Sequence, residues 1–332
     1  MDINTIDKSN MRETILKTYE QFSMGENCAG DLKVESKEFD WVCISGMGGS
    51  PMAGDILKSV ELDPQIIINR DYNLPNCISE KSLVVALSYS GNTEETISTY
   101  EEALKRKANL IVISSGGKLE EKAKKDNVIF IKIPKPFPDF QPRYATGYIF
   151  GALTKVLSNS QAIKSYSEQL KELANKLKNQ DEEQEGLMFA KKLKGKIPLF
   201  YASQKNIHIA RIAKIKINEN SKIPSFFNTF PEMNHNELVG FTNTLCSFYA
   251  IIFKDKDDQP QIQLRMDVCK NLFREKGIDT EEIQVKGNTQ LEKIFLTLNK
   301  IDWVCYYLAL EYGYDPTPVR IVEDLKKQLK KH

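Results

Sequence analysis

The chain has 332 residues, enough for one large domain or two medium ones with a sizeable core. Its 46 lysines and arginines balance 45 acidic residues, which excludes a broad basic surface for nucleic acid or anionic lipid. No apolar run approaches the roughly 20 residues that span a bilayer, and the start of the chain, MDINTIDKSNMRET, lacks the apolar region of a signal peptide. We therefore expect a cytoplasmic protein without nucleic-acid or membrane partners, which binds any anion at a local site.

The first half of the chain alternates strands and helices in the order that builds a parallel sheet covered on both faces. After a helix at Met11–Phe22, the pattern predicts strands at Trp41–Ser45, Gln65–Asn69, Ser82–Leu87, Leu110–Ser115 and Val128–Ile133. The helices between them are expected at Met52–Val60, Glu94–Arg106 and Lys118–Lys125, and a proline-rich stretch precedes a last helix at Ala145–Val156. Residues 1–158 are thus predicted to form one doubly wound domain.

The second half repeats this architecture after a charged helical linker at 159–194, which we expect to be interrupted near Gly186. Strands are predicted at Ile197–Ala202, Leu245–Phe253 and Glu282–Val285, and helices at Ile207–Glu219, Ile262–Lys276, Leu291–Tyr312 and Val319–Lys331. The predicted fold class is α/β, with two doubly wound parallel-sheet subdomains of three αβα layers and C-terminal helices. Residues 195–332 form the second subdomain, which lacks the glycine-serine loops of the first.

The segment Ser82–Thr96 carries the clearest chemical signal, because an apolar strand ends in a loop of hydroxyls and glycine that opens into a helix. Ser88, Ser90 and Thr93 can offer hydroxyls to an anion, and Thr93 stands where a helix N-cap belongs. Free loop N–H groups and the helix dipole, about half a positive charge at this end, would add to the attraction. This pattern favours a phosphate site, although an ordinary polar turn is the alternative.

A second strand-loop-helix junction, WVCISGMGGSPMAGDIL, precedes the first. Gly49 permits close backbone approach and Ser50 offers another hydroxyl. The glycine spacing is near the dinucleotide fingerprint, but that fingerprint wants an acidic residue at the end of the next strand, where this chain has Arg70 and then Asp71. Two such loops at successive strand ends instead suggest one small phosphorylated ligand.

Cofactor chemistry finds little support in the sequence. The six cysteines lack C-x-x-C spacing, which is typical of reduced thiols rather than a zinc site or disulfide framework. The chain has three histidines, His208, His235 and His332, and no two of them are close in sequence. We expect neither a metal nor a nucleotide cofactor.

Six ordered motifs resemble the bifunctional phosphoglucose/phosphomannose isomerases of the sugar isomerase (SIS) superfamily. They are GMGGSPMAGD, SYSGNTEET, PRYATG, INENSK, PEMNHNE and DPTPV, and they extend over about Trp41 to Lys326. Pro51 departs from the family pattern, which more often has glycine there, but Ser50 is retained. The resemblance implies two SIS subdomains and reversible isomerisation of glucose 6-phosphate and mannose 6-phosphate with fructose 6-phosphate, without a metal.

The resemblance also implies roles for three catalytic residues. Glu219 would carry the proton between C1 and C2, although most single glutamates are solvated surface groups. His235 would open the sugar ring, whereas a structural, hydrogen-bonded histidine is the alternative. Arg143 would steady the enediolate oxygens, and a surface arginine is its ordinary alternative.

Further implications concern the substrate end and the assembly. Gly49, Ser50, Ser88, Ser90 and Thr93 would bind the sugar 6-phosphate. Thr317 would leave room for either C2 epimer, and Lys326, or its neighbour Lys327, would lie near the substrate. His235 would come from a second subunit, so that the active form is a homodimer. Two other functions stay open: a sugar-phosphate-binding regulator that lost the chemistry, and an amino-sugar phosphate isomerase, although the N-terminal glutamine-hydrolysing domain usual in the latter is not in this sequence.

Overall fold

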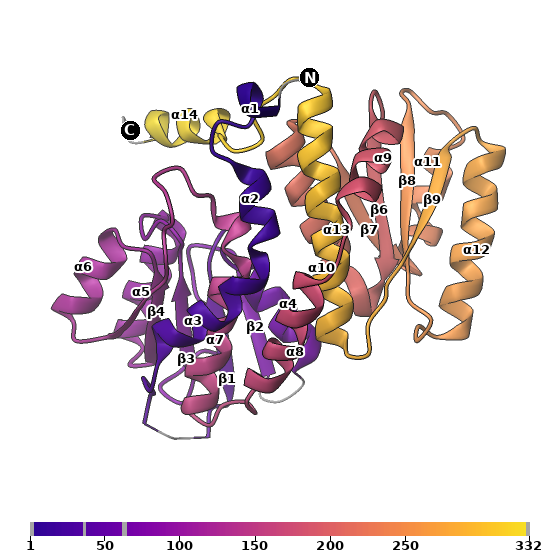
Figure 1. The fold of residues 1–332 in the computed structure, drawn as a ribbon. Coiled ribbons are helices and arrows are strands. Elements are labelled where there is room, and N and C mark those ends of the chain that lie inside the picture. Colours follow the sequence, from indigo (N-terminus) through magenta and orange to yellow (C-terminus); the bar gives the residue numbers. More distant parts are fainter. Residues whose placement is uncertain (1–2, 36–37, 62–64, 330–332) are drawn as a thin grey trace. The chain divides into compact units, whose positions relative to one another are not determined.

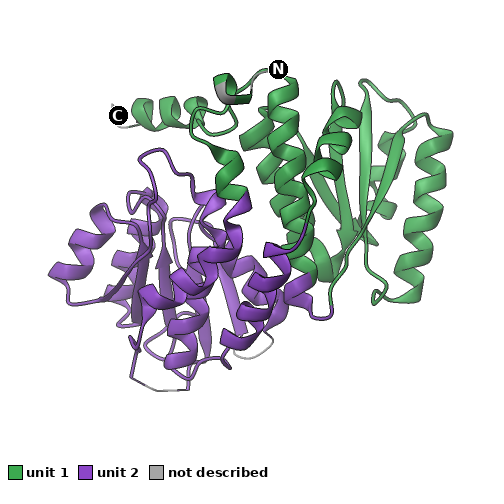
Figure 2. Ribbon diagram, viewed as in Figure 1, with its two compact units in different colours: residues 1–15, 181–287, 293–332 green, residues 16–180, 288–292 purple. Residues whose placement is uncertain are grey.

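The computed structural model describes residues 3–35, 38–61 and 65–329. The chain forms two compact units, each with one parallel sheet (Figures 1 and 2). The N-terminal unit comprises residues 16–180 and 288–292, and the C-terminal unit comprises residues 1–15, 181–287 and 293–332. The predicted division into 1–158, 159–194 and 195–332 is not decided by these units and stays a prediction.

The N-terminal unit is built on a five-stranded parallel sheet in the order β2-β1-β3-β4-β5. Its strands are β1 Trp41–Ser45, β2 Gln65–Asn69, β3 Leu83–Leu87, β4 Asn109–Ser114 and β5 Ile129–Lys132. The strand order reverses at β1, since β2 pairs with one edge of β1 and β3 with the other. In open α/β sheets ligands bind beyond the carboxyl ends of the strands at such a reversal.

Helices cover both faces of this sheet. On one face Cys43 and Val84 contribute to an apolar cluster with Tyr100 of α5 (Glu94–Lys105) and Leu119 of α6 (Lys118–Lys125). Successive strand residues point to opposite faces of a sheet. Ile44 accordingly lies on the opposite face, against Gly54 of α4 (Met52–Val60).

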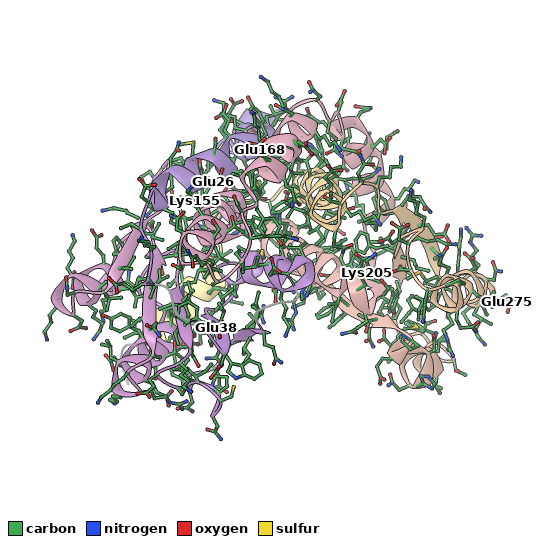
Figure 3. The ribbon with its side chains drawn as sticks, turned by 90° about the horizontal axis from the view of Figure 1, so that it is seen from below. Glu26, Glu38, Lys155, Glu168, Lys205 and Glu275 are labelled. Carbon is green, nitrogen blue, oxygen red and sulfur yellow. The ribbon has the colours of Figure 1, made fainter. Side chains whose placement is uncertain are left out.

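Two further helices of this unit, α3 (Gln21–Ala29) and α7 (Thr146–Asn159), approach each other closely. A Cβ atom at Gly25 would lie 2.1 Å from the Tyr148 carbonyl oxygen, so glycine is needed for this approach. The following helix, α8 (Ser167–Lys178), is joined to α3 by a hydrogen bond from Ser167 to Glu26, which is labelled in Figure 3 (2.6 Å).

The C-terminal unit has a four-stranded parallel sheet in the order β7-β6-β8-β9, the same order as the first four strands of the other unit. The strands are β6 Ile197–Ser203, β7 Phe226–Phe230, β8 Phe248–Lys254 and β9 Asp279–Gln284. One face is covered by α12 (Pro260–Glu275), whose Met266 and Phe273 pack with Tyr201 of β6. The other α-helices that lie wholly or mostly in this unit, among the described residues, are α1 Ile3–Ile6, α2 Met11–Leu16, α9 Glu183–Leu193, α10 Ile207–Lys216, α11 Glu237–Gly240, α13 Gln290–Glu311 and α14 Arg320–Leu329.

The predicted fold class, two parallel α/β sheets with C-terminal helices, is confirmed. Several predicted bounds are wrong. The first helix stops at Leu16 as α2 (Met11–Leu16), and after a 3₁₀ turn the chain continues as α3. The strand predicted at Leu245–Phe253 begins only at Phe248, and Leu245 is 87% exposed.

The linker is interrupted between Lys178 and Glu183 rather than near Gly186, which lies inside α9. A Cβ atom at Gly186 would lie 2.4 Å from Trp303 Cβ, so this glycine serves helix packing instead of breaking the helix. No helix among the described residues is both long and apolar enough to cross a bilayer.

Candidate active site

The loop after β3 is a compact turn built around Ser88 and Gly91. Ser88 Oγ accepts a hydrogen bond from the Gly91 N–H at 3.1 Å and lies 2.8 Å from Thr93 Oγ1. Gly91 has a φ of 67°, and a Cβ atom there would lie 1.7 Å from the Gly116 carbonyl oxygen. This turn therefore requires glycine for both conformation and space.

The same loop leads directly into α5. Thr93 occupies the N-cap position with extended backbone, as predicted, but its side chain makes no capping bond to the helix and its hydroxyl instead lies against Ser88. Ser90 is exposed, and its Oγ accepts a hydrogen bond from the Asn92 N–H at 3.3 Å. The positive end of the α5 dipole thus adjoins two hydroxyls of the loop, an arrangement suited to an anion.

The loop after β1 is held against the loop after β3. Ser50 is buried, and its Oγ accepts a hydrogen bond from the Tyr89 N–H at 3.0 Å. Gly49 lies against the backbone of Arg143, since a Cβ atom at position 49 would be 2.8 Å from the Arg143 nitrogen. The structure therefore brings the backbone of Arg143 against the loop that carries Gly49 and Ser50.

Arg143 lies in a 3₁₀ turn, Pro142–Tyr144, just before α7. Its side chain is fully buried, and the guanidinium carbon is 5.3 Å from the centre of the Tyr144 ring. The alternative of a surface arginine is therefore wrong. Arg143 thus places a buried positive charge beside the loop that carries Gly49.

In the C-terminal unit, Glu219 lies in a π-helical turn, Ile217–Ser221, that continues α10. The sequence predicted one uninterrupted α-helix up to Glu219. The structure differs in the last turn, which is π-helical instead of α-helical. Glu219 is half-buried, whereas Asn220 and Ser221 beside it are fully buried. Single π turns inside helices occur frequently at functional sites.

Lys222 follows this turn and was not singled out from the sequence. Its Nζ donates hydrogen bonds to the Glu219 carbonyl oxygen and, at 3.2 Å, to the Pro316 carbonyl oxygen. Pro316 precedes Thr317, which is 3% exposed and whose N–H donates to Asp315 Oδ1 at 2.9 Å. The lysine thus connects the Glu219 turn with the turn that carries Thr317.

His235 ends a 3₁₀ turn, Glu232–His235, that follows β7. Its side chain is exposed, but the turn beneath it is anchored, because Asn234 donates to Cys269 Sγ at 2.9 Å and accepts from Arg265 at 3.3 Å. Lys326 is exposed on α14, and its neighbour Lys327 pairs with Asp324 at 3.2 Å.

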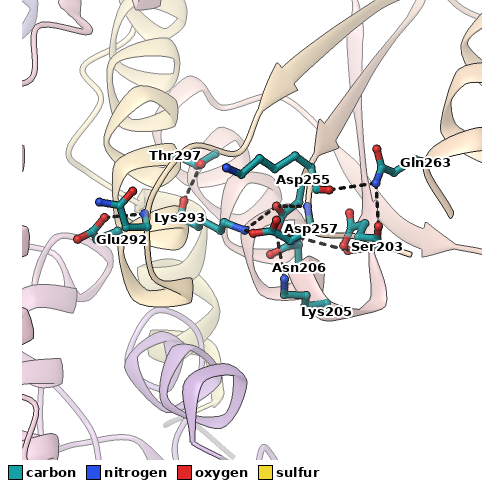
Figure 4. Close-up of polar contacts among 12 residues, drawn as sticks. Ser203, Lys205, Asn206, Asp255, Asp257, Gln263, Glu292, Lys293 and Thr297 are labelled. Atoms are coloured by element: carbon teal, nitrogen blue, oxygen red, sulfur yellow. Dashed lines mark hydrogen bonds and ion pairs between the residues drawn. The ribbon is translucent and has the colours of Figure 1, made fainter. Parts of the chain in front are cut away.

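The second sheet presents a different loop at the position that corresponds by strand order to the loop after β3. Asp255 and Asp257 follow β8, and both accept hydrogen bonds from Lys293 of α13, at 2.6 and 2.5 Å (Figure 4). Asp255 also accepts from Asn206, and Lys205 lies 3.3 Å away. Burial alone would raise the pKa of Asp255, but these donors outweigh it and lower the pKa to about 2.

This ionic cluster stands at the end of the third strand of the second sheet, where the first sheet has its hydroxyl loop. Two carboxylates and their lysines already satisfy one another where the first sheet has hydroxyls and glycine. Among the described residues, no group of three or more histidine, cysteine, aspartate or glutamate side chains is placed to hold a metal ion.

Comparison with known proteins identifies the family. A family model described as the bacterial phospho-glucose isomerase C-terminal SIS domain matches residues 182–329. The bifunctional phosphoglucose/phosphomannose isomerase of Aquifex aeolicus is 35% identical over 321 residues, which cover 95% of this chain and 96% of that protein. The protein of the same name from Caldicellulosiruptor bescii is 37% identical over 336 residues, which cover 96% of this chain and 97% of that protein.

The fold agrees with this relationship. A hypothetical protein of Thermus thermophilus with a crystal structure matches 96% of this chain and 89% of its own, with a TM-score of 0.75 and 14% sequence identity. At this low identity the match shows a shared fold, whereas the two relatives above show common descent over nearly the full length. The chain belongs to the family of bifunctional phosphoglucose/phosphomannose isomerases.

Proposed function

We propose that this chain interconverts fructose 6-phosphate with glucose 6-phosphate and mannose 6-phosphate through a cis-enediol(ate). The observation that carries the proposal is the identity of 35 to 37% with bifunctional phosphoglucose/phosphomannose isomerases over nearly the whole chain. The loops at the ends of β1 and β3 support it chemically, because their hydroxyls and the α5 N-terminus suit a phosphate group.

The phosphate would anchor the non-reacting end of the sugar. Ser88, Ser90 and Thr93, together with Gly49 and Ser50, are proposed to bind it through hydroxyl and backbone N–H groups. Binding energy from this end would then orient C1 and C2 for reaction, which is how a remote group can contribute to the rate.

The proton transfer is assigned to Glu219. Its carboxylate would remove the proton from C2 of the aldose and return it to C1, while the hydroxyl proton on O2 moves to O1 and O2 becomes the ketone oxygen of fructose 6-phosphate. Arg143 would stabilise the negative charge that develops on the enediolate oxygens. His235 would first open the ring, by giving a proton to the ring oxygen and taking one from the C1 hydroxyl.

Use of both epimers follows from the intermediate. C2 is planar in the enediolate, so a proton returned to one face gives glucose 6-phosphate and to the other face mannose 6-phosphate. Thr317 is buried and compact, which supports its proposed role of leaving room for either arrangement. Lys326 is proposed to lie near the substrate. We also propose that the active form is a homodimer, with His235 contributed by the second subunit.

A direct assay tests the activity. Purified protein would be given glucose 6-phosphate or mannose 6-phosphate with a chelator present, and fructose 6-phosphate would be measured by a coupled reaction. Turnover of both sugars is expected. Binding of both without turnover would instead indicate a sugar-phosphate-binding regulator, and turnover of glucosamine 6-phosphate alone would indicate an amino-sugar enzyme.

A further inference from the structure

Lys222 has an unusual backbone conformation for a lysine. Its φ is 60° and its ψ is 29°, in the left-handed region that favours glycine or asparagine. The residue directly follows the π-helical turn that carries Glu219. A non-glycine residue held in this region costs free energy and persists where surrounding contacts over-determine it.

The contacts of the side chain account for that conformation. The left-handed turn folds the lysine back, so that Nζ donates to the Glu219 carbonyl oxygen three residues earlier. The same Nζ donates to the Pro316 carbonyl oxygen at 3.2 Å, although Pro316 lies 94 residues further along the chain. A helix C-terminus has carbonyl groups that need such donors, and its dipole favours a positive charge there.

The two carbonyl groups belong to the turns of two proposed site residues. One is that of Glu219 itself, and the other belongs to the residue before Thr317, whose own N–H is held by Asp315. A shift of either turn would therefore be transmitted through one ammonium group to the other. Misplacement of a reacting group by about 1 Å can cost about 100-fold in rate.

We propose that Lys222 is a positioning residue, which fixes the Glu219 turn relative to the Thr317 turn and thereby sets both the rate and the preference between the two C2 epimers. The inference rests on the proposed function. Lys222 acts through two backbone carbonyl groups and is not assigned a contact with substrate.

Substitution with glycine gives the sharpest test, because glycine relaxes the left-handed backbone while it removes the ammonium group. Lys107 provides a matched control: it is an exposed lysine with a φ of 56° in the N-terminal unit. Lys107→Gly should leave the kinetics unchanged. Lys222→Gly should lower kcat by about tenfold or more with a smaller change in KM, and should shift the ratio of kcat/KM values for the two sugars.

Two further readouts separate positioning from general destabilisation. Amide hydrogen exchange at Thr317 should become faster in Lys222→Gly and stay unchanged in Lys107→Gly. Lys222→Arg, which keeps a cationic donor, should recover part of the rate and of the sugar ratio. If Lys222→Gly does not fold, Lys222→Met serves in the same comparison.

A folded Lys222→Gly or Lys222→Met variant with the sugar ratio and kcat of the parent protein would overturn this inference while leaving the proposed function intact. Absence of turnover by the parent protein itself would instead overturn the proposed function, and the inference with it.

Discussion

The Ser50 hydroxyl accepts a hydrogen bond from the Tyr89 backbone N–H at 3.0 Å, and this bond joins the loop after β1 to the loop after β3. The two residues are 39 positions apart in sequence, yet both are buried at the carboxyl ends of adjacent parallel strands. The bond thus connects two loops that are separate in the sequence.

Removal of this hydroxyl should therefore affect stability as well as binding. In Ser50→Ala the buried Tyr89 N–H loses its acceptor, which should cost about 1 to 3 kcal/mol of unfolding free energy. Urea denaturation followed by circular dichroism would measure the loss. Ser90→Ala is the matched control, because the exposed Ser90 hydroxyl makes a long 3.3 Å bond and its removal should change stability little. Equal stability losses in the two variants would contradict the joining role of Ser50.

The phosphate assignment makes a separate prediction for the loop after β3. Ser88→Ala combined with Ser90→Ala removes two hydroxyl contacts to a charged group, each worth about 1.5 to 3 kcal/mol. KM should rise by about 100-fold or more for both glucose 6-phosphate and mannose 6-phosphate. Unchanged KM values in the folded double variant would place the phosphate elsewhere.

Exchange of the C2 proton with solvent reports directly on the proton transfer. Glu219→Gln retains the size of the side chain but removes the base, so exchange of the C2 proton with solvent deuterium should be lost and kcat should fall by about 10²- to 10⁴-fold. His235→Ala should reduce activity less when the substrate is already open-chain. Near-normal turnover by Glu219→Gln would require another base.

Assembly of the site from two chains can be tested by complementation. Glu219→Gln and His235→Ala subunits, each inactive alone, would be mixed under conditions that allow exchange. If His235 comes from the second subunit, each heterodimer should contain one intact site and regain activity. A heterodimer that forms but stays inactive would show that both residues act within one chain.

The ionic cluster of the second sheet should make the protein sensitive to acid. The pKa of Asp255 is about 2 in the folded chain and about 3.9 in an unfolded one. A lowered folded pKa gives stability that is present above pH 4 and is lost as the pH falls toward 2, in total on the order of 2 kcal/mol. Stability measured by denaturation between pH 5 and 2 should fall across this window.

Removal of the lysine tests the cause of that shift. Lys293→Met leaves Asp255 buried without its main partner and should destabilise the neutral protein by about 3 to 5 kcal/mol. Its stability should also fall less between pH 4 and 2 than that of the parent. Lys122→Met, which removes only a surface pair with Glu101, should cost at most about 1 kcal/mol. A similar loss of stability in both variants would mean that the buried cluster contributes no more to stability than a surface ion pair.

Local sequence patterns were sufficient for much of the first sheet. The strands at Trp41–Ser45 and Gln65–Asn69 and the helix at Met52–Val60 have the predicted bounds, because each is an uninterrupted apolar or amphipathic run beside glycine or polar turns. The six family motifs likewise indicated the family correctly, since their order along the chain is more specific than any one of them.

Features that depend on distant residues were not visible in the sequence. The strand β7, FFNTF, went unpredicted because it is a short edge strand between prolines and contains polar Asn228 and Thr229. Arg143 lies against Gly49, and the π-helical turn at Glu219 is bonded through Ser221 to the Cys305 carbonyl oxygen, so both involve segments far away in the sequence. The same is true of Lys222, whose partner Pro316 is 94 residues away.

The contact between Gly91 and the Gly116 carbonyl oxygen has a practical consequence for engineering of sugar preference. Most variants in a library that varies position 91 would have a steric clash in the folded state, since even the Cβ atom of alanine would lie 1.7 Å from that oxygen. The neighbouring Asn92 also holds this turn, because its Nδ2 donates to the Ser90 carbonyl oxygen at 3.0 Å and its Oδ1 accepts from the Lys118 N–H at 3.1 Å. Directed evolution of sugar preference should therefore keep Gly91 and Asn92 and place its variation outside this turn.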